Sequence, residues 1–210
     1  PLVVTSAGLT INAHTPVTAA IAPGAWTVSV ARTAGFQPGD VVLLIQSTGL
    51  ADRASGDQSP VVLDAVNVGR YELVRLASVA AGRFTLEAPA QGAYDATGTQ
   101  AVLVPEYTTV TIAGAGSLVA PSWDGASGGV LAFLATGTVT NAGILSANAA
   151  GFRGGVRHVD WYVAPANCPG LDEPSPRAER KGEGLIPGRY TPTSTGRGNA
   201  ANGAGGANCI

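Results

Sequence analysis

Short apolar runs recur along the first 150 positions, each bounded by glycine, proline or small polar residues. Trp26 to Val30 alternates apolar and polar positions with a period of two, which is typical of a strand with one buried face. Val41 to Ile45 is a continuous apolar run, too short for a helix and typical of a strand buried on both faces. No segment shows the 3.6-residue period of an amphipathic helix. The pattern therefore predicts an all-β domain over residues 1–150.

Turn residues indicate how some of these strands connect. The runs 71–79 and 83–86 flank Ala80-Ala81-Gly82, which predicts a hairpin. The runs 100–104 and 107–112 are separated by Pro105, which has no N–H to donate to a strand ladder. Pro105 should therefore mark an edge or a break. In the turn before Val41, Phe36 is expected to plug the core and Asp40 to accept backbone N–H bonds.

From residue 114 onward the rhythm changes to short segments punctuated by glycine. Residues 116–120 (GSLVA) resemble residues 143–147 (GILSA), 27 positions later, and residues 137–141 (GTVTN) are a looser variant. Residues 129–134 between them are predicted to form another apolar strand. Short strands with recurring glycine corners favour a β-solenoid that resembles a right-handed β-helix. A β-sandwich would show similar local patterns and remains the alternative.

Residues 151–210 differ in composition from the rest of the chain. They hold 12 of the 29 glycines and 6 of the 14 prolines and show little periodicity. We expect an irregular Gly/Pro-rich segment there. The only cysteines, Cys168 and Cys209, are predicted to clamp it with a disulfide, and two free thiols or a partner outside the chain are the alternatives.

The charge content and the first residue of the chain indicate which partners and which cellular location to expect. Only 12% of the residues are charged and the net charge is −2, which gives no electrostatic footprint for nucleic acid. No apolar stretch reaches the ~20 residues of a transmembrane helix. The chain begins at Pro1 and contains no Met, which favours removal of a signal peptide and export to the bacterial cell surface. A chain boundary of another origin is the alternative.

No arrangement of residues in the sequence demands catalysis. The loop carboxylates could converge in space, but no spacing requires it; they are Asp52, Asp57, Asp64, Asp95 and Asp124. The two histidines are His14 and His158, and the sequence contains no Gly-x-Ser-x-Gly elbow that would provide the nucleophile of a serine hydrolase. We therefore expect no catalytic residues, no metal and no cofactor.

Residues 157–162 (RHVDWY) hold the densest group of charged and aromatic side chains that could bind a ligand. Trp161 and Tyr162 could stack on sugar rings while Arg157 and Asp160 hydrogen-bond hydroxyls. The alternative is that Trp161 and Tyr162 cap an open end of the β core.

Several segments occur in an order that resembles a family of large, Gly-rich secreted or cell-surface proteins, described as adhesin-like, of gliding and predatory bacteria. The matching segments are residues 10–12, 16–20, 34–46 (AGFQPGDVVLLIQ), 69–72 (GRYE), 104–108, 118–125 (LVAPSWDG), 128–130, 143–147, 151–155 (GFRGG) and 181–184, with the closing Gly/Asn-rich run. The resemblance implies an N-terminal module of a longer surface protein, and it carries no ligand or catalytic residues onto this chain.

These observations favour an extracellular structural or adhesive module. Its expected partners are copies of itself, other cell-surface components or glycans. A polysaccharide-binding module and a β-helix enzyme that degrades polysaccharide are the alternative hypotheses. For the enzyme, at least two carboxylates, or a carboxylate and an arginine, must meet in one groove.

Overall fold

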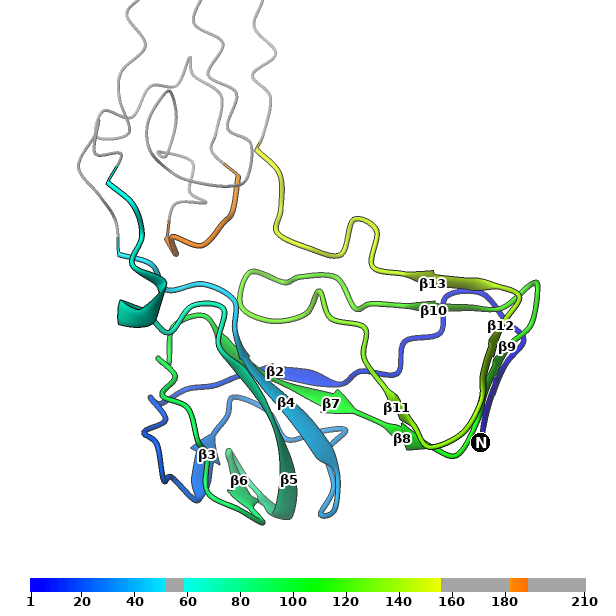
Figure 1. Cartoon of the computed structure of the whole chain (residues 1–210), viewed down its shortest axis with the longest axis horizontal. Coiled ribbons are helices and arrows are strands. Elements are labelled where there is room, and N and C mark those ends of the chain that lie inside the picture. Colours follow the sequence, from blue (N-terminus) through cyan, green and yellow to red (C-terminus); the bar gives the residue numbers. More distant parts are fainter. Residues whose placement is uncertain (52–58, 156–181, 189–210) are drawn as a thin grey trace, which may run out of the picture. The chain divides into compact units, whose positions relative to one another are not determined.

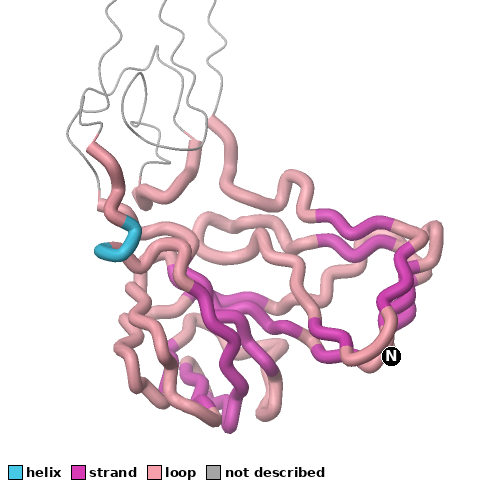
Figure 2. The backbone as a smooth tube through the Cα atoms, in the orientation of Figure 1, coloured by secondary structure: helices cyan, strands magenta, loops and turns pink. Residues whose placement is uncertain are grey.

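The computed structural model describes residues 1–51, 59–155 and 182–188. They form two compact units, residues 1–47 with 69–151 and residues 48–68 with 152–210. The regular elements of the described residues are thirteen strands and one 3₁₀ helix, joined by long loops (Figure 2), which confirms the prediction of an all-β fold. No helix in the described ranges is long and apolar enough to cross a membrane.

A curled antiparallel sheet forms the first part of the larger unit. Its strands follow the order β2-β7-β4-β5-β6-β3. Their bounds are β2 His14–Pro16, β3 Thr27–Ser29, β4 Val41–Gln46, β5 Tyr71–Ala80, β6 Arg83–Leu86 and β7 Thr99–Val104. The predicted hairpin is β5 and β6, and β7 ends immediately before Pro105, as expected. Figure 1 shows β4 and β5 side by side in this sheet.

The two outer strands of the curled sheet also pair with each other. Val17, just after β2, bridges antiparallel to Val30, just after β3. Thr18 N–H donates to Ser29 at 2.9 Å, and Ala31 N–H donates to Pro16 at 3.0 Å. The sheet therefore closes into a small six-stranded barrel. Closure protects strand edges that would otherwise be exposed.

Apolar side chains from every barrel strand except β2 fill the interior. Leu44, Leu76 and Phe84 are fully buried there. Phe36 plugs one end of the core, with its ring 4.9 Å from that of Phe84, and Asp40 accepts a hydrogen bond from Gln37 N–H at 2.7 Å. Both roles match the sequence prediction.

The second part of the larger unit is a stack of short parallel strands. Its strands are β1 Leu2–Val4, β8 Glu106–Tyr107, β9 Val110–Ile112, β10 Ser117–Val119, β11 Leu134–Ala135, β12 Val139–Asn141 and β13 Ile144–Ser146. Parallel pairing joins β1-β9-β12, β8-β11 and β10-β13. The chain returns to the same column after 28, 29 and 27 residues, as Glu106 pairs with Leu134, Val110 with Val139 and Ser117 with Ile144. The 27-residue repeat seen in the sequence is therefore a real register, and Figure 1 shows β10 and β13 running together.

Two sequence predictions in this region were wrong in detail. Residues 129–133 form no strand, and only Leu134 of that run belongs to β11. Gly128 and Gly129 have positive φ, and the side chains of Leu131 and Phe133 pack on the core of the stack instead of extending a ladder. The predicted strand over 107–112 is interrupted at residues 108–109, which divides it into β8 and β9.

Two buried amides join the stack to the barrel. Asn12 Nδ2 donates to the carbonyls of Leu103, at 2.8 Å, and Ala132, at 2.6 Å. The side chain of Gln100 hydrogen-bonds to both backbone groups of Gly128. The barrel and the stack therefore form one unit.

In the smaller unit, the described residues include the 3₁₀ helix η1, Leu63–Ala65. Gly49 and Leu50 both donate their N–H groups to the carbonyl of Leu185, at 2.9 Å each. Glu183 is mostly buried and accepts hydrogen bonds from the backbone N–H, Nε and Nη2 of Arg153. This charge-assisted pair holds the segment around Glu183 against residue 153.

Candidate functional site

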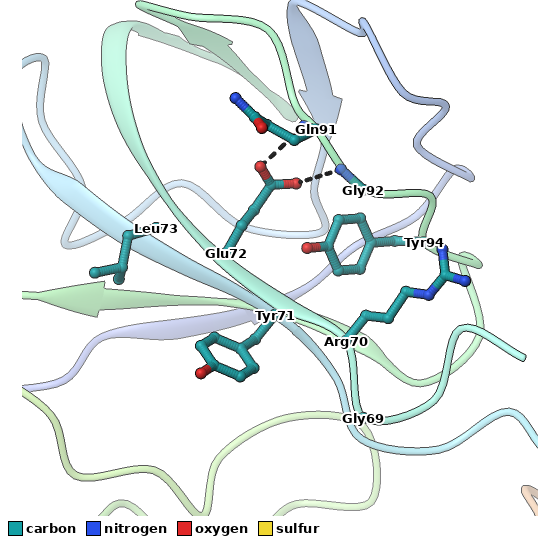
Figure 3. A pocket seen from close by; sticks show the side chains of 8 residues that line it. All are labelled: Gly69, Arg70, Tyr71, Glu72, Leu73, Gln91, Gly92 and Tyr94. Atoms are coloured by element: carbon teal, nitrogen blue, oxygen red, sulfur yellow. Dashed lines mark hydrogen bonds between the residues drawn. The ribbon is translucent and has the colours of Figure 1, made fainter. Parts of the chain in front are cut away.

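A depression of about 560 Å³ opens in the wall of the barrel beside the start of β5. Figure 3 shows the residues that line it, which are Gly69, Arg70, Tyr71, Glu72, Leu73, Gln91, Gly92 and Tyr94. Small ligands usually bind in concave sites where a few polar groups converge. We therefore take it as the candidate site.

The depression exists because the ladder between β5 and β6 stops early. β5 pairs with β4 from Tyr71 onward but pairs with β6 only from Leu76 onward, with a register shift between Leu76 and Ser78. The last bond on that side is Glu87 N–H to the carbonyl of Arg75, at 2.9 Å. Pro89 follows in the sequence and cannot donate to a ladder. The segment after β6 therefore leaves β5, and a gap opens between them.

Glu72 bridges this gap with its side chain. Its Oε2 accepts the N–H of Gln91 at 2.9 Å, and its Oε1 accepts the N–H of Gly92 at 3.2 Å (Figure 3). A Cβ atom at position 92 would lie 2.9 Å from the Tyr94 ring, so the loop approaches the floor this closely only with glycine. The carboxylate thus fixes the shape of the depression.

The floor of the site is the ring of Tyr94, which is almost completely buried. Burial raises the pKa of its phenol, and the negative charge of Glu72 raises it further, while the nearby Arg70 charge lowers it. The phenol therefore stays neutral beside the Glu72 carboxylate.

Unpaired backbone groups face the depression from β5. In an antiparallel ladder, alternate residues bond to opposite neighbours. Gln46 N–H donates to Arg70 at 3.0 Å and Leu76 N–H donates to Asp40 at 2.9 Å, so the even-numbered residues of β5 bond to β4. The N–H and C=O groups of Tyr71 and Leu73 point the other way, toward the gap.

The rim adds aromatic and apolar surface. Tyr71 is 70% exposed and Leu73 is 52% exposed. In Figure 3 both side chains point away from Glu72 and Tyr94, as expected for alternate residues of a strand. The site thus offers donors, acceptors, a guanidinium from Arg70, an amide from Gln91 and an exposed ring at its edge. This combination suits a neutral, hydroxyl-rich ligand.

A second polar group surrounds His14. The Nδ1 of His14 lies 2.9 Å from Oγ of Ser127, and Oδ2 of Asp124 lies 3.5 Å from the same Oγ. Arg32 pairs with Asp124 at 3.7 Å. The residue types match a serine hydrolase, but the order does not, because the histidine must stand between the serine and the aspartate. Ser127 is also completely buried, so this group supports the turn at residues 124–127.

The loop carboxylates named from the sequence have separate surroundings. Asp95 forms two hydrogen bonds with the side chain of Gln46, both 2.8 Å long. Asp124 accepts the N–H groups of Ala126 and Ser127. Asp64 lies in η1, and Asp52 and Asp57 lie outside the described residues. Across the described ranges, no three His, Cys, Asp or Glu side chains gather as metal ligands do.

The binding and disulfide predictions fall elsewhere. The residues predicted to bind a ligand or to form the disulfide all lie outside the described residues; they are Arg157, Asp160, Trp161, Tyr162, Cys168 and Cys209.

The sequence did not predict the site beside β5, although it holds one signal for it. Glu72 shares its strand face with the core residues Val74 and Leu76, where an apolar side chain is the norm.

No family model and no curated protein matches this chain. Among solved structures, it is similar to three phage tailspikes. Gp54 of the Acinetobacter baumannii bacteriophage AP22, solved in complex with A. baumannii capsular saccharide, is 17% identical with a TM-score of 0.33, over 52% of this chain and 19% of the tailspike. The tailspike gp49 of Pseudomonas phage LKA1 is 16% identical with a TM-score of 0.33, over 54% of this chain and 18% of the tailspike. The tailspike gp61 of Pseudomonas phage phi297 is 14% identical with a TM-score of 0.35, over 65% of this chain and 20% of the tailspike. The chain thus spans about a fifth of each tailspike, and similarity this low transfers neither a fold nor a ligand to it.

Proposed function

We propose that this chain is an adhesive module of a secreted or cell-surface bacterial protein and that it binds a saccharide at the depression beside β5. The observation that carries the proposal is the strand edge inside that depression. Tyr71 and Leu73 present alternating backbone donors and acceptors there, flanked by Arg70 and Gln91. Sugar hydroxyls both donate and accept hydrogen bonds, so they match such an edge. The exposed Tyr71 ring provides the flat apolar surface that sugar rings pack on.

The proposed role is binding and not catalysis. Glu72 is the only carboxylate among the residues that line the depression. Its oxygens accept the N–H groups of Gln91 and Gly92. It therefore positions the loop. A glycosidase of the usual kind would need a second carboxylate across the site.

We further propose that the parallel strands form a short β-solenoid. Three columns return after 27 to 29 residues, and glycine occupies its corners. The apolar interior at Val110, Ile112 and Leu118 supports this assignment. Low charge and the sequence resemblance to adhesin-like surface proteins support the extracellular setting.

The test is a glycan array of bacterial capsular and exopolysaccharide fragments, followed by calorimetric titration of the strongest hits. We expect Arg70→Ala, Tyr71→Ala and Gln91→Ala each to weaken binding by about tenfold or more, equivalent to ~1.4 kcal/mol. Arg83→Ala and Gln37→Ala are the matched controls, because both residues are exposed and do not line the depression. A silent array, or a hit that all three site variants bind as well as the wild type, would overturn the proposal.

A further inference from the structure

The parallel stack has two ends that match each other. One column of inward side chains runs from Leu9 through Leu118 to Leu145. Leu118 in the middle is completely buried, whereas Leu9 is 40% and Leu145 is 42% exposed. A second column runs from Leu2 through Val110 to Val139, and its last member is 44% exposed. Among the described residues, part of the apolar interior is therefore exposed at each end, at Leu9 on one side and at Leu145 and Val139 on the other, whereas Val4 of β1 is buried.

The backbone at both ends is equally open. Within the described ranges, β1 pairs only with β9, β12 only with β9 and β13 only with β10. Each of these strands thus keeps one row of backbone groups without a strand partner. Such edges are templates for another strand.

Both ends lack the charged residues and prolines that commonly protect edge strands against strand addition, although the strands themselves are only three residues long. Native edge strands are commonly blocked by charged side chains, especially lysine, or by proline. Residues 2–13 and 125–151 contain no Asp, Glu, Lys, Arg, His or Pro. They include all three end strands and the exposed Ile144 beside Leu145. Nothing in these segments repels an approaching strand of the same kind.

We propose that copies of this chain stack end to end through these two edges, with the β12–β13 end of one copy against the β1 end of the next. All strands in the stack are parallel, so both ends present the same strand direction. Leu145 of one copy then continues the column at Leu9 of its neighbour. The contact joins two different surfaces and does not close on itself, so it leads to linear assemblies.

Sedimentation velocity over a wide range of protein concentration tests this directly. The wild type should sediment faster as its concentration rises. Leu9→Lys and Leu145→Lys should each leave the protein monomeric, because every copy then lacks one of the two ends that the contact needs, and Ile144→Lys should act like Leu145→Lys. The matched control is Leu63→Lys, whose residue is 73% exposed in η1, and it should assemble like the wild type. Circular dichroism confirms that each variant keeps the β fold.

Mixing the two blocked variants separates this contact from any symmetric one. Leu145→Lys keeps a free β1 end and Leu9→Lys keeps a free β13 end, so the mixture should form dimers and nothing larger. Neither variant should dimerise alone. A wild type that remains monomeric at every concentration overturns the proposal, and so does a single blocked variant that dimerises by itself.

Discussion

The side-chain amide of Gln100 hydrogen-bonds to both backbone groups of Gly128. Its Oε1 accepts the Gly128 N–H at 2.7 Å, and its Nε2 donates to the Gly128 carbonyl at 3.1 Å. All four groups are buried, and the two residues belong to the barrel and to the segment that leads to β11. One amide thus replaces a strand partner at the junction of the two parts.

Replacing Gln100 with leucine should destabilise the protein strongly. The change keeps the volume but leaves the N–H and the C=O of Gly128 without partners. Each unsatisfied buried group costs about 1–3 kcal/mol, so for the two groups we expect a loss of about 2–6 kcal/mol in urea unfolding. Gln37→Leu, at an exposed position, should change stability by less than about 0.5 kcal/mol. Equal effects of the two substitutions would contradict the assigned role of Gln100.

The role of Glu72 can be followed at two individual amides. In Glu72→Ala, the N–H groups of Gln91 and Gly92 lose their acceptor and should exchange with solvent deuterium about tenfold faster or more. Glu72→Gln keeps a single acceptor oxygen, so only one of the two amides should remain slow. Exposed Glu87, on the same loop, provides the control Glu87→Ala, and NMR-detected exchange is the measurement. Unchanged exchange in Glu72→Ala would show that other contacts hold the loop.

Gly143 should not tolerate even a methyl group. A Cβ atom there would lie 2.3 Å from the carbonyl oxygen of Gly116 and 2.4 Å from that of Ala113, and backbone cannot move aside easily. Gly143→Ala should therefore cost about 3 kcal/mol, at the upper end for overpacking. Gly151→Ala is the matched control, because a Cβ atom there has open space around it. Chemical denaturation that shows the same midpoint for both variants would argue against the tight corner.

Acid should destabilise the turn at residues 124–127 in two steps. Burial is the main cause that lowers the pKa of His14 from its usual 6.5, with the Asp124 charge opposing and the Arg32 charge assisting. The unfolded chain therefore binds a proton on His14 at a higher pH than the folded protein, so stability falls as the pH drops below 6.5.

The second step belongs to Asp124. Burial raises its pKa, but hydrogen bonds from the N–H groups of Ser127 and Ala126 and the charges of His14 and Arg32 hold it below the usual 3.8. The folded carboxylate thus resists protonation, and its contribution disappears as the pH falls through this lower value. Urea midpoints measured against pH should show the first step in the wild type and not in His14→Gln. If the variant retains the slope just below pH 6.5, another group is responsible.

Local patterns in the sequence predicted much of the fold. The apolar run from Val41 and the turn at residues 80–82 correspond to β4 and to the β5–β6 hairpin. The GSLVA and GILSA segments are neighbours in space, since Ser117–Val119 pairs with Ile144–Ser146. These features depend on short-range alternation and on a repeat, both of which a sequence displays directly.

The features that escaped prediction depend on residues far apart in the chain. Barrel closure requires Val17 to meet Val30, and the junction requires Gln100 to reach Gly128, yet neither residue type nor spacing marks these pairs. The site beside β5 exists because a ladder stops, and the sequence shows this only as Pro89 and a charged residue at an inward position of a strand. Gly92 looks ordinary until Tyr94 is placed beneath it.

The position of β1 has a consequence for the folding pathway. Leu2 pairs with Val110 and Leu9 with Leu118, so the first turn of the stack and its nearest neighbour are separated by the entire barrel sequence. Closing loops of that length carries an entropic cost before any contact is gained, and chains dominated by such distant pairings fold slowly. The turns after residue 105 are close in sequence and can pair early, whereas the first turn can pair with β9 only after the barrel has folded and brought residues 2–9 close to residues 110–118. Until then the outer edge of β9 remains open, and that interval is when an unassisted chain is most exposed to misassembly.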